Sequence, residues 1–186
     1  MSKQNNLINN AKEKLKSEIL EIENRTDISN DEKVDKIIKV FSMSCAAIAV
    51  QPIPFADIFV LTPIQAYMGT RIAAIRGVPI STDKMTEIVK ELAGVVGMGL
   101  FAQQLAIGAY KTFIPFLGAI TTIPMVYGLT FAIGKVIDMY FIKKSRNEIL
   151  STDQIKSIMK RTLEQKKKEG KKMRDEIWKS RKDYGS

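Results

Sequence analysis

Two long stretches without a charged side chain constrain this fold more than any other feature. They cover residues 92–110 and 112–134, and only Lys111 separates them. A helix needs about 20 mostly apolar residues to cross the hydrocarbon core of a membrane, so both stretches meet the length criterion for a transmembrane hairpin. Two buried helices at the centre of a soluble bundle fit the same pattern. Either way, residues 92–134 are expected to form a central apolar helical hairpin.

Small and polar residues within these stretches favour close helix packing in either setting. Gln103, Gln104, Pro115 and Pro124 make both stretches less hydrophobic than a typical span. Several of the small residues pair at four-residue spacing: Ala93, Gly97, Ala102, Ala106, Gly108, Gly128 and Ala132. A glycine costs about 1 kcal/mol relative to alanine inside an exposed helix. This many small residues therefore indicate neighbouring backbones that approach closely.

Basic residues flank the hairpin on both sides and predict its orientation if it spans a membrane. They are Arg71, Arg76, Lys84 and Lys90 before it, and Lys135, Lys143, Lys144 and Arg146 after it. By the positive-inside rule, both termini would then be cytoplasmic. The first 14 residues contain no apolar run, which argues against a cleaved signal peptide. We expect a cytoplasmic-membrane location, with the cytoplasm as the alternative.

Most of the net charge of +9 lies in the last quarter of the chain. Residues 143–186 carry fifteen basic and seven acidic side chains. Their densest group is Lys166, Lys167, Lys168, Lys171 and Lys172. Each basic residue near an anionic leaflet contributes about 1 kcal/mol, so these lysines are expected to face anionic lipid or a partner surface. A solvated tail is the alternative. Nucleic acid ranks lower, because no aromatic platform or base-reading motif accompanies the lysines.

The rest of the chain has the residue spacing of amphipathic helices. Apolar residues recur every three or four positions in two N-terminal segments: Leu7, Ala11, Leu15, Ile19 and Ile22 in one, Val34, Ile37, Ile38, Phe41, Cys45 and Ile48 in the other. Ser29 and Glu32 match a capping box, which predicts a helix start between these segments. A further helix is expected from Pro54 to Gly77. Ser-Thr-Asp sequences at Ser81 and Ser151 predict two more helix starts.

These patterns predict an all-α fold. We expect a helical bundle with the central apolar hairpin and with long amphipathic N- and C-terminal helices. Residues 1–39 form an amphipathic arm, residues 40–142 a central domain that includes the hairpin, and residues 143–186 a basic helical tail.

An acid within an apolar, proline-rich run predicts a structural polar centre. If Pro54 occupies the first helical position, Asp57 lies at the edge of the first turn, where free amide groups stabilise a carboxylate. Gln65 falls on the same helix face. Asp138 is the other acid of the apolar centre and a candidate third member. Because buried polar groups are usually satisfied locally, a structural role is preferred to an ion or ligand site.

The residue inventory argues against catalysis. The chain has one cysteine, Cys45, and no histidine, so histidine-based acid–base chemistry and nearly all zinc sites are excluded. The glycine-rich run at residues 94–99 lacks the Lys-Ser/Thr ending of a phosphate-binding P-loop. We expect no catalytic residues, no cofactor and no bound metal, and therefore no enzyme.

The central segment, about Val40 to Ile142, resembles the bacterial YcjF-type domain of unknown function. The resemblance is carried by Pro54, Asp57, Leu61, Gln65, Gly77, Gly134 and Phe141. Such domains occur beside or fused to Era-like small GTPases, and the resemblance implies association with the inner membrane. Because this chain has no P-loop, it implies a separate small GTPase as a partner.

Three functions stay open from the sequence. The first is a non-enzymatic, membrane-associated accessory or adaptor protein linked to a small GTPase. The second is a soluble helical regulatory or binding module with both apolar stretches buried. The third is an effector whose helical hairpin inserts into a membrane. Self-association is compatible with each.

Overall fold

The computed structural model describes residues 3–50, 61–96 and 115–184. Within these residues it contains seven α-helices, one short 3-10 helix and no strand, which confirms the all-α class. The elements are α1 (Lys3–Asn24), α2 (Asn30–Ala49), α4 (Leu61–Ile75), α5 (Thr82–Val96), α7 (Pro115–Ser145), α8 (Thr152–Lys172), α9 (Arg174–Ser180) and η1 (Arg181–Tyr184). Pro54, Asp57 and most of the first hairpin arm, residues 97–110, lie outside the described residues.

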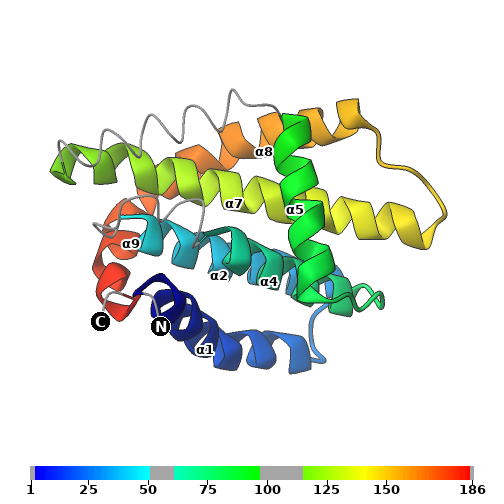
Figure 1. Cartoon of the computed structure of the whole chain (residues 1–186), viewed down its shortest axis with the longest axis horizontal. Coiled ribbons are helices and arrows are strands. Elements are labelled where there is room, and N and C mark those ends of the chain that lie inside the picture. Colours follow the sequence, from blue (N-terminus) through cyan, green and yellow to red (C-terminus); the bar gives the residue numbers. More distant parts are fainter. Residues whose placement is uncertain (1–2, 51–60, 97–114, 185–186) are drawn as a thin grey trace.

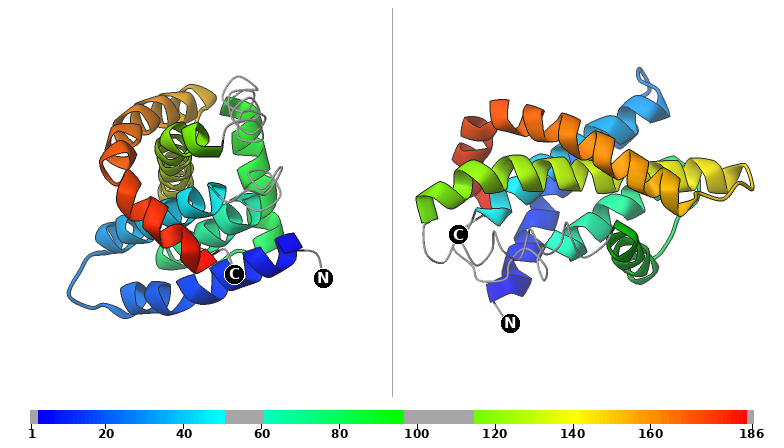
Figure 2. Two further views of the ribbon diagram at one scale, coloured as in Figure 1. Left: turned by 90° about the vertical axis from the view of Figure 1, so that its left-hand side faces the viewer. Right: turned by 90° about the horizontal axis from the view of Figure 1, so that it is seen from above.

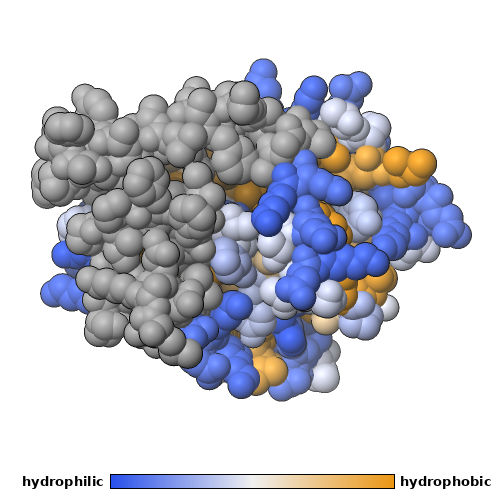
Figure 3. Space-filling model, in the orientation of Figure 1, coloured by the Kyte–Doolittle hydropathy of each residue, from blue (hydrophilic) through white to orange (hydrophobic). Residues whose placement is uncertain are grey.

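Helix α7 forms the centre of the bundle. α8 lies along one side of it, α2 and α4 pack on the other side, and α1 covers α2 and α4 from outside (Figures 1 and 2). α5 crosses this stack steeply, burying Met85, Val89 and Leu92. The exposed side of α5 contributes hydrophilic surface to this face of the molecule (Figure 3). The long N- and C-terminal helices are therefore walls of one core.

The described part of the chain contains one helical segment that is long and apolar enough to cross a membrane. It is Thr122–Ser145 in α7, and 72% of its most apolar 18-residue window is buried inside the protein. From Thr122 to Gly134 every residue except Met125 is buried, so the buried residues lie on all sides of this part of the helix. The core helix of a helical bundle has the same length and composition, so this segment is weak evidence for a span.

Glycines bring α7 close to its neighbours, as the small residues predict. A Cβ atom on Gly128 would lie 3.0 Å from the backbone nitrogen of Lys167. In the opposite direction, a Cβ atom on Gly170 would lie 3.0 Å from the Cα atom of Pro124. The backbones of α7 and α8 therefore approach each other from both sides, and a larger residue at either position would push them apart.

Local sequence signals set most of the helix ends. The capping box at α2 is present: Ser29 Oγ accepts a hydrogen bond from the backbone N–H of Glu32 at 3.2 Å, and the Glu32 carboxylate accepts one from Ser29 N–H at 2.9 Å. Ser151 and Gln154 repeat this arrangement at α8. Gly77, with φ of +75°, ends α4, and the N–H of Val78 returns to Ala73 O.

Candidate functional site

The predicted lysine segment is part of α8 and is divided between two environments. α8 carries eight basic and three acidic side chains. Its apolar side, with Ile155, Met159 and Leu163 buried, packs against the bundle. Helical periodicity places Lys166 on that same side and Lys168, Lys171 and Lys172 away from it.

The three outward lysines are exposed and form no ion pair with another described residue. Lys168, Lys171 and Lys172 are three and four positions apart, so their ammonium groups share one side of the helix. Lys167 is half-buried beside α7, where its backbone nitrogen faces Gly128. We call Lys168, Lys171 and Lys172 the basic surface of α8.

Lys166 instead belongs to a partly buried polar cluster. Its Nζ donates a hydrogen bond to Glu169 Oε2 at 2.6 Å and lies 4.1 Å from the centre of the Phe131 ring. The Tyr127 hydroxyl donates to the other carboxylate oxygen of Glu169 at 2.7 Å. Burial opposes ionisation of Glu169, but the hydrogen bonds from Lys166 and Tyr127 outweigh it and lower the pKa of this carboxyl below its ordinary value.

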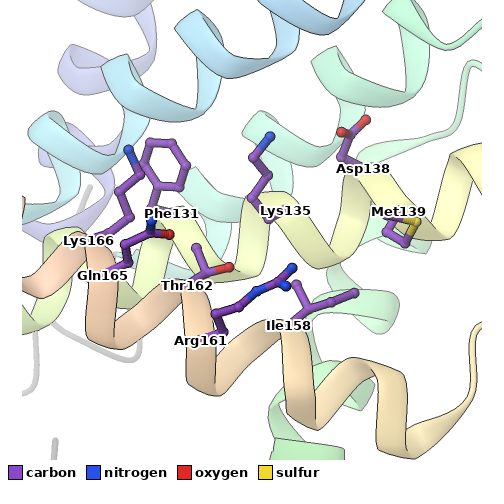
Figure 4. Close-up of a pocket in the computed structure, with 9 residues that line it drawn as sticks. All are labelled: Phe131, Lys135, Asp138, Met139, Ile158, Arg161, Thr162, Gln165 and Lys166. Atoms are coloured by element: carbon purple, nitrogen blue, oxygen red, sulfur yellow. The ribbon is translucent and has the colours of Figure 1, made fainter.

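A groove opens between α7 and α8 on the side that Lys166 faces, with a volume of about 440 Å³ (Figure 4). Three apolar side chains line it, Phe131, Met139 and Ile158. The polar lining comes from both helices, with Lys135 and Asp138 on α7 and Arg161, Thr162, Gln165 and Lys166 on α8. We call this cavity the α7/α8 groove.

Most charges around the α7/α8 groove are paired within the described residues, and one guanidinium has no partner among them. Lys135 forms an ion pair with Asp35 of α2. Asp138 accepts a hydrogen bond from Arg76 at 2.7 Å and points away from Arg161 (Figure 4). Arg161 is exposed and has no ion-pair partner among the described residues. The net charge of this lining is therefore positive.

Asp138 is held by Arg76, which lies 62 positions away in the sequence. Arg76, at the end of α4, also donates from Nη1 to Asp31 at 2.7 Å. It thereby joins the start of α2, the end of α4 and the C-terminal half of α7. Only 10% of the Asp138 side chain and 13% of the Arg76 side chain are exposed, so this pair is largely shielded from water.

Gln65 lies in a separate polar contact. Its side-chain amide donates a hydrogen bond to Thr130 Oγ1 at 3.1 Å. Cys45 is completely buried, and although a hydrogen bond with Thr130 counteracts the effect, burial raises the pKa of its thiol to about 12. The thiol therefore stays protonated and is a poor nucleophile. Gln65 and Asp138 thus have different partners, while Asp57 lies outside the described residues.

The described residues contain no group of three or more His, Cys, Asp or Glu side chains that could hold a metal ion. Comparisons with protein-family models, with curated proteins and with solved structures found no match. The likeness to YcjF-type domains therefore stays a prediction made from the residues.

Proposed function

We propose that this chain is a non-enzymatic adaptor protein that binds the cytoplasmic face of a membrane through the basic surface of α8. The observation that carries the proposal is the position of Lys168, Lys171 and Lys172, which are exposed together and unpaired within the described structure. Three such residues contribute about 3 kcal/mol near an anionic leaflet. This binding is peripheral and reversible, and both termini stay in the cytoplasm.

The packing of α7 supports peripheral attachment in preference to a spanning helix. Insertion of α7 into lipid would separate it from α2 and α8. It would also break two side-chain hydrogen bonds, from Gln65 to Thr130 and from Tyr127 to Glu169. Each broken bond would leave a polar group without its partner in an apolar medium, at a cost of about 1–3 kcal/mol.

The protein partner in this proposal is a small GTPase, which is the class that the resemblance to YcjF-type domains implies. Any nucleotide hydrolysis would belong to that partner. Nucleic acid is not proposed, because the basic surface of α8 has no accompanying aromatic platform.

A soluble cytoplasmic binding module is the second candidate. The burial of 72% of the apolar window in α7 favours it, because a folded bundle of this kind needs no lipid. A membrane-inserting effector is the third candidate, and it requires α7 to leave the core.

Sedimentation with vesicles tests the proposal on the full chain. Wild type should sediment with phosphatidylcholine vesicles in which roughly one lipid in three is anionic phosphatidylglycerol. It should stay in solution with vesicles of phosphatidylcholine alone. A triple variant, Lys168→Gln, Lys171→Gln and Lys172→Gln, should lose most of this binding. The matched control is Lys36→Gln, Lys39→Gln and Lys90→Gln, which removes the same charge from exposed positions on α2 and α5.

The outcomes separate the three candidates. Binding that high salt releases, and that only the α8 triple variant loses, supports the peripheral adaptor. If wild type stays in solution with every vesicle, the result favours the soluble module and contradicts the membrane proposal. Release of an encapsulated dye from the vesicles would instead favour the inserting effector.

A further inference from the structure

We propose that the α7/α8 groove binds a small organic anion that combines one carboxylate or phosphate group with an apolar part. This inference is independent of membrane binding, because it rests on residues other than the basic surface of α8.

The size of the groove suits a small molecule. Its volume of about 440 Å³ lies within the range of ligand sites in proteins, roughly 300–1,000 Å³. It is a cleft between α7 and α8, the most extensively packed pair of helices among the described residues, so the folded protein itself forms the site.

Arg161 supplies the charge that selects an anion. Its guanidinium faces the groove from α8 (Figure 4) and is not engaged by any carboxylate of the described structure. A planar guanidinium binds carboxylate and phosphate groups through two parallel hydrogen bonds. Gln165, one helical turn further along α8, adds an amide group to the same lining.

The other charged side chains of the groove already have partners, so none of them neutralises Arg161. Asp138 is bound to Arg76 at 2.7 Å, and its side chain is 10% exposed. Lys166 is bound to Glu169, and Lys135 is bound to Asp35. Among the described residues, the groove lining therefore keeps one unpaired positive charge, which matches one anionic group on a ligand.

The apolar lining requires more of the ligand than its charge. Met139 and Ile158 both line the groove, and each is only half-buried. A ligand with an apolar part would cover them and gain about 25 cal/mol for each Å² of apolar surface removed from water. Inorganic phosphate lacks this part and should bind less tightly.

Isothermal titration calorimetry with phenyl phosphate tests the proposal on the full chain. Wild type should bind one molecule, and Arg161→Gln should weaken the binding at least about tenfold, since a charge-assisted hydrogen bond is lost. The matched control is Arg146→Gln, which removes the same charge from an exposed position outside the groove and should leave Kd within about twofold. Because both arginines are exposed, both variants are expected to fold, and thermal unfolding verifies this.

Three results would contradict the proposed ligand. Absence of phenyl phosphate binding to wild type overturns it, as does equal binding to wild type and Arg161→Gln. Equal affinity for inorganic phosphate and phenyl phosphate overturns the apolar requirement and with it the proposed ligand class.

Vesicle binding by Arg161→Gln distinguishes two sources of the anion. Unchanged vesicle binding with loss of phenyl phosphate binding assigns the groove to a free anion, and loss of both assigns it to a lipid head group. The α8 triple lysine variant should bind phenyl phosphate like wild type, so failure of the membrane proposal leaves this test intact.

Discussion

The contact between α7 and α8 is closed at one end and open at the other. At the closed end, Gly128 and Gly170 let the two backbones approach closely. A Cβ atom added at either position would lie 3.0 Å from a backbone atom of the other helix. At the open end, Met139, Ile158 and Arg161 line the groove between the two helices. The same pair of helices therefore supplies both the tightest packing and a cavity, and side-chain size decides which.

Gly128→Leu should have the largest effect, because it places a side chain where α7 meets the backbone of α8. A Cβ atom there lies 3.0 Å from Lys167 N and 3.1 Å from Leu163 O, and backbone atoms cannot rotate away. We expect a loss of about 3 kcal/mol in the free energy of unfolding, measured by urea denaturation. Ala74→Leu, at an exposed position of α4, should change it by less than about 0.5 kcal/mol. Equal free energies of unfolding for the two variants would show that α7 and α8 are not tightly packed at Gly128.

Tyr127→Phe should have the next effect, since it removes one hydrogen bond at the closed end without changing the packing. The ring is buried, and its hydroxyl donates to Glu169 at 2.7 Å. We expect a loss of about 1–2 kcal/mol in the free energy of unfolding. Tyr140→Phe is the matched control, because no side-chain hydrogen bond of its hydroxyl is present in the described structure. The idea fails if both variants unfold at the same urea concentration.

Glu169→Gln should have a smaller, pH-dependent effect. The hydrogen bonds from Lys166 and Tyr127 lower the pKa of Glu169 in the folded protein below the ordinary 4.5. A carboxyl with a lowered folded pKa stabilises the fold fully above 4.5, and this contribution is lost as the pH falls through the folded pKa. Because the carboxylate is partly exposed, we expect at most about 1 kcal/mol.

The difference in unfolding free energy between wild type and Glu169→Gln is measured from about pH 7 to about pH 3, because this range brackets the ordinary carboxyl pKa. The difference should be constant at the upper end and shrink below 4.5. A difference that grows on acidification would mean that the carboxyl is destabilised in the folded state.

Met139→Ala should have the smallest effect, because Met139 lines the open end and is half-buried. We expect a loss of about 0.5–1 kcal/mol, since little cavity is created where space already exists. Met159→Ala removes a methionine that is 3% exposed in the α8 interface and should cost about 2–4 kcal/mol. Similar costs for both methionines would mean that the groove is closed in solution.

Local features of this fold were predictable because their causes are local. The capping box at Ser29, the glycine that ends α4 and the close approach at Gly128 each follow from a few adjacent residues or from residue size alone. The orientation of Lys166 could also be read from helical spacing, since it follows Leu163 by three positions. A count of charges along the segment hides this, because it treats all five lysines alike.

The pairings at the candidate site were not predictable because they join distant parts of the chain. Arg76 binds Asp138 across 62 positions, and Gln65 binds Thr130 across 65. In the sequence, Arg76 indicates only a charged flank of an apolar segment. The groove is similarly hidden, because Arg161 and Gln165 alone look like ordinary solvated positions of an amphipathic helix.

The reciprocal glycine contact has a consequence for how the lysine-rich end of the chain can be studied. α8 covers α7 through Leu163 and Gly170, so deletion of the chain after Ile149 would uncover a long apolar helix. Such a fragment should aggregate or be digested by proteases, and it could stick to lipid through its newly bared side chains. The effect of losing the lysines could then not be separated from the effect of uncovering α7. Charge must therefore be removed from this region by point substitution.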